Sequence, residues 1–258
     1  MRRLGARRLG ASGARPLAAL LVCALAAALG CAVDDGETCE IATQDISAVA
    51  LVVDSGWDVR ATIDFEAGDR RGANSPLRLC STDRLTINGQ DPVMTEKADR
   101  IEYALSLPAD GARSFDFRLE RETEAEVIEM SIELPAVFEV VAPMDGEIFE
   151  TSAEHLVQWE PALDGGMMRL RLGEPIGGGE CLVAMQEGHT YETEAGVLVP
   201  DTGQWTIPAG VLTSQSTTDC TLTYTLSRVA LAPYPEVLQR SGRVEARTER
   251  YVDVTVLP

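Results

Sequence analysis

The chain has six cysteines, and their spacing limits the chemistry that they can carry out. Thiols hold metal ions, act as nucleophiles or form disulfides, and spacing and compartment decide among these roles. No two of the cysteines stand two residues apart, so the spacing of a zinc site is missing. The six are Cys23, Cys31, Cys39, Cys80, Cys181 and Cys220. Their fate therefore depends on whether the chain is exported to an oxidising compartment.

Patterns for catalysis or phosphate binding are weak in this sequence. His155 and His189 are the two histidines, and neither belongs to a Cys/His or His-Glu-x-x-His arrangement, so we expect them at the surface or at strand ends. The glycines 177–179 lack the Lys and Ser/Thr that complete a phosphate loop. We therefore predict a protein that is not an enzyme and needs no cofactor or metal. A hydrolase that uses paired carboxylates stays open as the alternative, since the chain has 41 acidic residues.

Two further groups of side chains could bind a ligand. Asp64, Glu66 and Asp69 could offer oxygens to calcium at a strand end, but they lack the register of a dedicated loop, and solvated acids are the simpler interpretation. The three tryptophans lie in β-like runs, which favours core packing over an exposed aromatic surface for a glycan or peptide. They are Trp57, Trp159 and Trp205.

The first thirty residues have the organisation of a secretory signal peptide. Five arginines and no acid occupy residues 1–15, and 17–30 is an uncharged stretch that is too short to span a bilayer. The sequence Ala-Leu-Gly-Cys at 28–31 resembles the lipobox of bacterial lipoproteins. This resemblance implies cleavage before Cys31, a diacylglycerol thioether on its sulfur and palmitate-type acyl chains. Ordinary signal peptidase cleavage after the same small residues is the alternative.

Lipidation of Cys31 would leave an even number of cysteines in the mature chain. The cysteine of the signal peptide is removed, and an unpaired thiol in an oxidising compartment is a liability. Four cysteines allow three connectivities, of which the simplest joins neighbours in the sequence. We therefore predict two disulfides, each worth about 3–4 kcal/mol in the chain-entropy model. They are Cys39–Cys80 and Cys181–Cys220.

The charge balance is strongly acidic. The chain has 22 Lys and Arg against 41 Asp and Glu, a formal charge of −19, and five of the arginines belong to the signal peptide. Such a surface repels phosphate backbones and anionic headgroups, so we expect no nucleic-acid binding and attachment to the membrane only through the lipid. A solvated surface is the simplest interpretation, and weak binding of cations or of a basic partner is the alternative.

The mature part of the chain has the period of β-strands. Residues 114–120 and 127–134 alternate apolar and charged side chains around a polar loop, as antiparallel strands with one buried face do. Residues 46–54 and 57–65 are rich in β-branched side chains, with the turn Ser55-Gly56 between them. Asn88-Gly89 predicts a tight turn, and Pro92 confines the strand that follows to a sheet edge. We predict an all-β protein of two tandem antiparallel β-sandwiches.

The second half of the chain resembles fibronectin type III and related Ig-like domains. Trp159 is followed closely by Pro161, Tyr224 lies where the family has a tyrosine in its penultimate strand, and residues 250–256 supply a final strand. Both cysteines of this half follow Trp159, which departs from true Ig domains. The predicted organisation is a signal peptide at 1–30, an acidic tether at 31–38, one sandwich at 39–135 and a second at 136–258.

These observations predict a lipoprotein of the cell envelope, held at the outer membrane or on a periplasmic or surface side. We expect a non-enzymatic binding or scaffolding module whose end loops contact a protein or glycan ligand. A passive structural subunit of a surface assembly and the carboxylate hydrolase are the alternatives. Binding by end loops is an analogy at the level of the fold.

Overall fold

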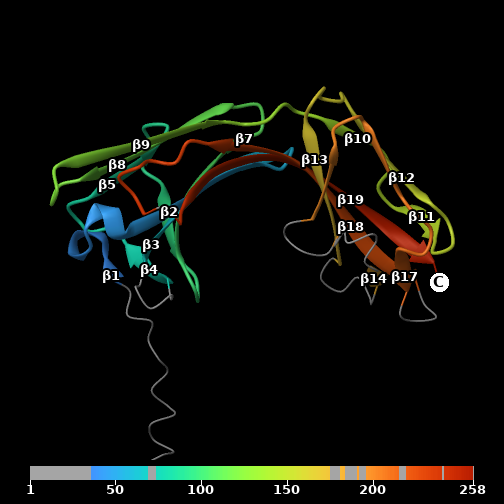
Figure 1. Ribbon diagram of the computed structural model, residues 1–258, viewed down its shortest axis with the longest axis horizontal. Helices are drawn as coiled ribbons and strands as arrows, with labels where there is room; N and C mark the ends of the chain where they lie inside the picture. The colour runs from blue at the N-terminus through green and yellow to red at the C-terminus, as the bar shows by residue number, and fades with distance from the viewer. Residues whose placement is uncertain are drawn as a thin grey trace, which may run out of the picture. The chain divides into compact units, whose positions relative to one another are not determined.

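The computed structural model describes residues 36–68, 74–174, 181–183, 191, 196–214, 219–239 and 241–257 (Figure 1). Over these ranges the fold is all-β, as predicted, and its helical content is two short 3-10 turns, η1 (Thr38–Glu40) and η2 (Thr43–Asp45). The helices in this part of the chain are too short to cross a bilayer. Residues 1–35, which include Cys31 and the predicted signal peptide, lie outside the described ranges.

The strands of the first half follow the alternation of apolar residues closely. The predicted hairpin at 114–134 is confirmed as β8 and β9, and Asn88 and Gly89 take the positive φ angles of 51° and 72° that a tight turn requires. The strands are β1 (Gly36–Glu37), β2 (Ile46–Asp54), β3 (Asp58–Gly68), β4 (Asn74–Arg78), β5 (Arg84–Ile87), β6 (Val93–Glu96), β7 (Ile101–Pro108), β8 (Ser114–Arg121) and β9 (Glu126–Glu133).

The strands of the second half are shorter, except for the last two. The final pair forms one long antiparallel ladder, in which Cys220 faces Val256 and Ala232 faces Val244. The strands are β10 (Glu139–Ala142), β11 (Glu147–Glu150), β12 (His155–Glu160), β13 (Met167–Gly173), β14 (Cys181–Val183), β15 (Val197–Pro200), β16 (Gln204–Ile207), β17 (Leu212–Ser214), β18 (Cys220–Ala232) and β19 (Arg243–Leu257).

One 11-stranded sheet connects the two halves of the chain. Its main path runs β1-β4-β3-β2-β19-β18-β13-β15, with β7 and β6 added on β3 and with β11 on β19. Three of its pairs are parallel, namely β1 with β4, β2 with β19, and β11 with β19. This differs from the purely antiparallel sheets that the sequence predicted. The parallel pair of β2 and β19 joins strands from opposite ends of the chain, which local alternation does not specify.

The first hydrophobic core lies between this sheet and the three-stranded sheet β5-β8-β9. Alternate residues of β2, β3, β8 and β9 point into it, including Phe65, Phe115 and Phe117. The core also takes in Leu238, Val244 and Ala246, which lie far beyond the predicted boundary at residue 135. The first half of the chain is therefore covered in part by the start of β19.

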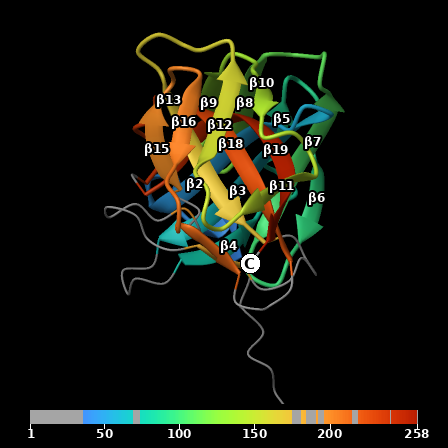
Figure 2. The ribbon, with the colours of Figure 1, turned by 90° about the vertical axis from the view of Figure 1, so that its right-hand side faces the viewer.

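The second core lies between the other end of the large sheet and the three-stranded sheet β10-β12-β16. Figure 2 looks onto this end, with β10, β12 and β16 in front of β18. Trp159 and Tyr224, which carried the resemblance to Ig-like domains, are both buried here. Val252, Val254 and Val256 of β19 form one wall of this core, as the alternation of the last strand predicted.

Arginines fix the segment that passes from one core to the other. Arg113 and the Thr248 hydroxyl both donate to the Pro135 carbonyl. Arg228 donates to the carbonyls of residues 136 and 137 and forms a buried ion pair with Asp201, with 2.6 Å between Nε and Oδ2. The next residue, Phe138, packs below the guanidinium of Arg228, 5.0 Å from the ring centroid. The connection is thus held by side chains from the residue before β8, from β18 and from β19.

The Arg228–Asp201 pair yields a prediction about stability. Their side chains are 2% and 0% exposed, so Arg228→Leu leaves a buried carboxylate without its charged partner. We expect the free energy of unfolding to fall by about 3–5 kcal/mol in urea titrations. Arg84→Leu removes an ion pair to Asp91 that lies in solvent and is the control, for which we expect little change. Equal, small effects of both substitutions would contradict this account.

Candidate functional site

A groove of about 440 Å³ lies where strands of the two cores meet on β19. Its lining comes from three separate segments of the chain: the turn between β2 and β3, the segment from β10 to the start of β11, and the middle of β19. Its walls combine exposed apolar side chains with a few charged ones. The lining residues are Ser55, Gly56, Trp57, Glu139, Val140, Pro143, Met144, Asp145, Arg250, Tyr251 and Val252.

Two aromatic rings form one wall of the groove. The rings of Trp57 and Tyr251 are stacked, with centroids 6.4 Å apart and planes inclined by 20°. Trp57 is 74% exposed and Tyr251 is 37% exposed. Most tryptophans are stabilised by burial, and the exposed Trp57 indole lacks this stabilisation. Its exposure therefore indicates a ligand-binding surface more strongly than the exposure of a single aliphatic side chain does.

The turn that carries Trp57 is rigid for local reasons. The Ser55 hydroxyl donates to the Asp58 carboxylate at 2.5 Å, and the Gly56 amide donates to Asp54 Oδ1 at 2.9 Å. Gly56 has a φ of +96°, a conformation that favours glycine. The Asp54 side chain is only 2% exposed. These bonds fix the backbone and leave the indole ring projecting from the turn.

Arg250 forms part of the groove beneath this turn. Its guanidinium lies 3.4 Å from Asp54 Oδ1 and 5.8 Å from the centroid of the Phe138 ring. Arg113 approaches the second oxygen of Asp54 at 2.5 Å. Arg250 is therefore tied to the protein by Asp54 and Phe138, and its charge is partly balanced before any ligand arrives.

A second wall is the segment between β10 and β11, whose turn begins at a cis peptide bond, Ala142–Pro143. Met144 is 71% exposed there, and its amide donates to Glu147 Oε2 at 2.8 Å. Asp145 Oδ1 accepts the Asp253 amide at 3.2 Å, which ties this turn to β19. Both walls are thus bonded to the same strand, and the groove between them is part of the folded framework.

Tyr251 is held by the neighbouring Glu249 side chain. Its hydroxyl donates to the Glu249 carboxylate, and Glu249 also lies 3.6 Å from Arg247. Burial and this hydrogen bond raise the pKa of Tyr251 above its usual value, while Arg171 and Arg247 lower it less. The phenol therefore stays protonated, and its ring faces the groove with its hydroxyl directed to the protein.

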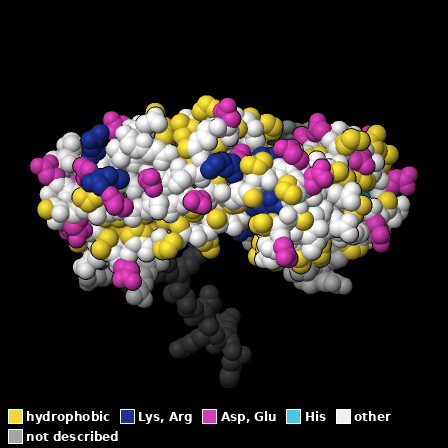
Figure 3. All heavy atoms as spheres, turned by 90° about the horizontal axis from the view of Figure 1, so that it is seen from above, with side chains coloured by type: hydrophobic (Ala, Val, Ile, Leu, Met, Phe, Trp, Pro, Cys, Tyr) yellow, Lys and Arg dark blue, Asp and Glu magenta, His cyan; other side chains and the backbone are white. Residues whose placement is uncertain are grey.

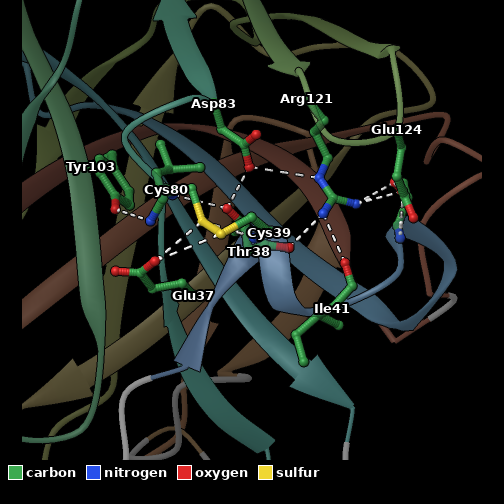
Figure 4. A network of polar contacts seen from close by, with 11 residues as sticks. Glu37, Thr38, Cys39, Ile41, Cys80, Asp83, Tyr103, Arg121 and Glu124 are labelled. Atoms are coloured by element: carbon green, nitrogen blue, oxygen red, sulfur yellow. Dashed lines mark hydrogen bonds and ion pairs between the residues drawn. A yellow bond between two sulfur atoms is a disulfide. The ribbon is translucent and has the colours of Figure 1, made fainter.

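A second polar network fastens the start of the fold and lies apart from the groove (Figure 4). The Arg121 side chain is fully buried and donates to the carbonyls of Thr38 and Ile41 and to the Glu124 carboxylate. The Thr38 hydroxyl donates to Asp83 Oδ2 at 2.6 Å. Residues 36–38, predicted as part of the tether, therefore belong to the folded body, where Thr38 is completely buried.

Both predicted disulfides are present. Cys39–Cys80 joins η1 to the loop after β4, with 5.8 Å between Cα atoms, and Cys181–Cys220 joins β14 to β18, with 5.6 Å. Glu37 lies beside the first pair, but the two sulfurs are bonded to each other and are not free to hold a metal ion. The two bridges indicate an oxidising, extracytoplasmic compartment.

The other residues that the sequence singled out lie elsewhere. His155 begins β12 but is buried rather than at the surface, with Nδ1 3.1 Å from the Tyr224 hydroxyl, and burial lowers its pKa. His189, Asp69 and the glycines 177–179 fall outside the described residues. Trp159 is in the second core, and Trp205 packs against it.

Trp57 was predicted to pack in the core, and that prediction is wrong. It was grouped with the strand that follows, but it is the last residue of the turn before β3. The signal that identifies it is its position directly after Ser55-Gly56, because a residue at the tip of a turn has no core to enter. Tyr251 had no comparable signal, since it alternates regularly with the buried valines of β19.

No family model and no curated protein sequence matches this chain. The groove therefore has to be interpreted from its own chemistry.

Asp64 and Glu102 form a carboxylate pair on the face of the large sheet that points away from the first core. They are opposite each other in the β3–β7 register. Asp64 Oδ1 is buried and, in the described part of the chain, has no hydrogen-bond partner. Burial raises the pKa of Asp64 to about 6. Burial also acts to raise the pKa of Glu102, but hydrogen bonds from Lys97 and Arg60 outweigh it and lower that pKa.

This pair yields a prediction about pH. Because the folded state raises the pKa of Asp64 from 3.8 to about 6, folding favours its protonated form, and stability falls as the pH rises through this window. Asp64→Asn should remove that loss of stability. We expect the free energy of unfolding of the variant to exceed that of the parent by about 1 kcal/mol at pH 7, after allowance for solvent screening. At pH 4 the variant should be no more stable than the parent.

Thermal unfolding measured between these two pH values checks the prediction. Asp99→Asn is the matched control, because Asp99 is an exposed aspartate in the turn between β6 and β7. A gain from Asp64→Asn that is the same at both pH values would show that titration of this carboxyl is not the cause.

Proposed function

We propose that this chain is a membrane-anchored binding protein of the cell envelope that takes its ligand in the groove beside Trp57. The proposal includes export by the signal peptide at 1–30, a lipid on Cys31 and two Ig-like or fibronectin III-like sandwiches that share the large sheet. The observation that carries it is the stack of Trp57, exposed on a rigid turn, against Tyr251 of β19, which lines a groove of about 440 Å³. Recognition through rigid aromatic side chains is common at binding surfaces, because such side chains lose little conformational entropy on contact.

A lipid on Cys31 would place the folded body, with its groove, close to the membrane. From Cys31 to Gly36, where β1 begins, the chain spans five residues, so an extended segment would reach at most about 18 Å. The network around Arg121 and the Cys39–Cys80 bridge then fasten the fold at the end of that segment. Lipidation at Cys31 would hold the folded body close to the membrane, with the groove presented by the junction of the two cores.

The groove is tested by Trp57→Ala. Exported protein is incubated with envelope extract, cross-linked and purified, and the captured material is quantified. We expect the substitution to lower specific capture at least tenfold. Truncation of an aromatic side chain at the centre of a binding surface often costs about 2–4 kcal/mol of binding free energy. Leu231→Ala removes another apolar side chain that is 72% exposed, on β18, and should capture as the parent does. Undiminished capture by Trp57→Ala would refute the groove as the binding site.

The anchor is tested by Cys31→Ala. We expect the parent protein to sediment with membranes and to carry the mass of a lipid, and the variant to be released without that mass. Cys23→Ala is the matched control, because it changes a cysteine that the proposal removes with the signal peptide. A Cys31→Ala protein that still sediments with membranes would show that the chain is held there in another way.

A further inference from the structure

The exposed charged side chains that line the groove are acidic. Glu139 and Asp145 are exposed and line it, and Asp58 is exposed next to Trp57 in the same turn. The one basic residue in the lining, Arg250, lies against Asp54 and the Phe138 ring. An approaching ligand therefore meets exposed carboxylates at the groove, while the arginine is already engaged by the protein.

The aromatic rings of the groove also favour a cationic ligand. The face of an indole or phenol ring carries negative electrostatic potential and attracts a cation within about 6 Å of its centroid. Tyr251 donates its hydroxyl proton to the Glu249 carboxylate, which makes the ring more electron-rich. Trp57, at 74% exposure, leaves most of its surface open to such a group.

The charge of the whole chain favours the same class of partner. With a formal charge of −19 the protein attracts cationic molecules from a distance and repels anionic ones. Figure 3 shows acidic side chains spread over the face viewed, with the basic ones gathered in a few places. A neutral sugar would stack on the rings but would make no use of this field.

We propose that the groove binds an arginine side chain in a basic segment of a partner protein, an inference that rests on the function proposed above. The planar guanidinium would lie flat on the exposed face of the Trp57 indole, which is stacked on Tyr251, and its N–H groups would donate to Glu139 or Asp145. Arginine suits the site better than lysine, because its planar group stacks on a ring while it forms hydrogen bonds in its own plane.

Titration calorimetry on the full exported protein tests this inference. The ligands are a Gly/Ser peptide that carries arginines, the same peptide with citrulline in their place, and a neutral glucan oligosaccharide. Citrulline keeps the planar shape and removes the charge. We expect the arginine peptide to bind at least tenfold more tightly than the citrulline peptide, with an affinity that falls as NaCl is raised.

Three variants locate the binding. Trp57→Ala should weaken the arginine peptide about tenfold, and Glu139→Gln combined with Asp145→Asn should weaken it by a similar factor and reduce its dependence on salt. Leu231→Ala should leave it unchanged. Circular dichroism and the thiol count confirm that each variant is folded with both disulfides.

Several results would overturn the inference. Equal binding of the citrulline peptide would show that charge is not recognised, and arginine binding that is insensitive to Trp57→Ala would show attraction to the acidic surface in general. Binding of the oligosaccharide alone, dependent on Trp57 and independent of salt, would make the ligand a glycan. If no ligand binds but capture from envelope extract still depends on Trp57, the cationic ligand is wrong and the proposed function stands. If neither occurs, both fail.

Discussion

The antiparallel ladder between β18 and β19 is the constraint on which the rest of this structure depends. It pairs β18 along its entire length, from Cys220 opposite Val256 to Ala232 opposite Val244. One end supplies Val252, Val254 and Val256 to the second core, and the other supplies Val244 and Ala246 to the first. Neither core is complete without this hairpin, so the two halves of the chain share their hydrogen-bonded framework as well as a connecting segment.

The groove is a consequence of that sharing. The turn with Trp57 is joined to β19 through Arg250 and Asp54, and the turn with Asp145 is joined to the same strand through the Asp253 amide. Arg228 and Arg113 fix the carbonyls of the segment between the cores. The turn with Trp57 and the turn with Asp145 are therefore held at fixed positions relative to each other. A rigid aromatic wall of this kind loses little entropy when a ligand binds.

Local sequence was informative wherever one strand or one turn decides the structure. The hairpin of β8 and β9, the Asn88-Gly89 turn and the two disulfides were all predictable, because alternation, turn chemistry and cysteine parity act over short distances or through simple counting. The parallel pairing of β2 with β19 was not predictable, since the residue pattern of neither strand specifies which strand it pairs with. For the same reason the groove was missed, as its three segments are brought together by the pairing of β2 with β19 and of β11 with β19.

Native-state hydrogen exchange along β18 and β19 tests the central claim most directly, because it reports the free energy of opening for each amide. If the ladder unites the two cores, amides at its centre, near Leu226 and Arg250, exchange only in the global unfolding reaction and are as well protected as those beside Tyr224 and Ala246. If the centre opens at a much lower free energy while the amides on either side remain protected, the cores are independent units, and the fixed groove at their junction is contradicted.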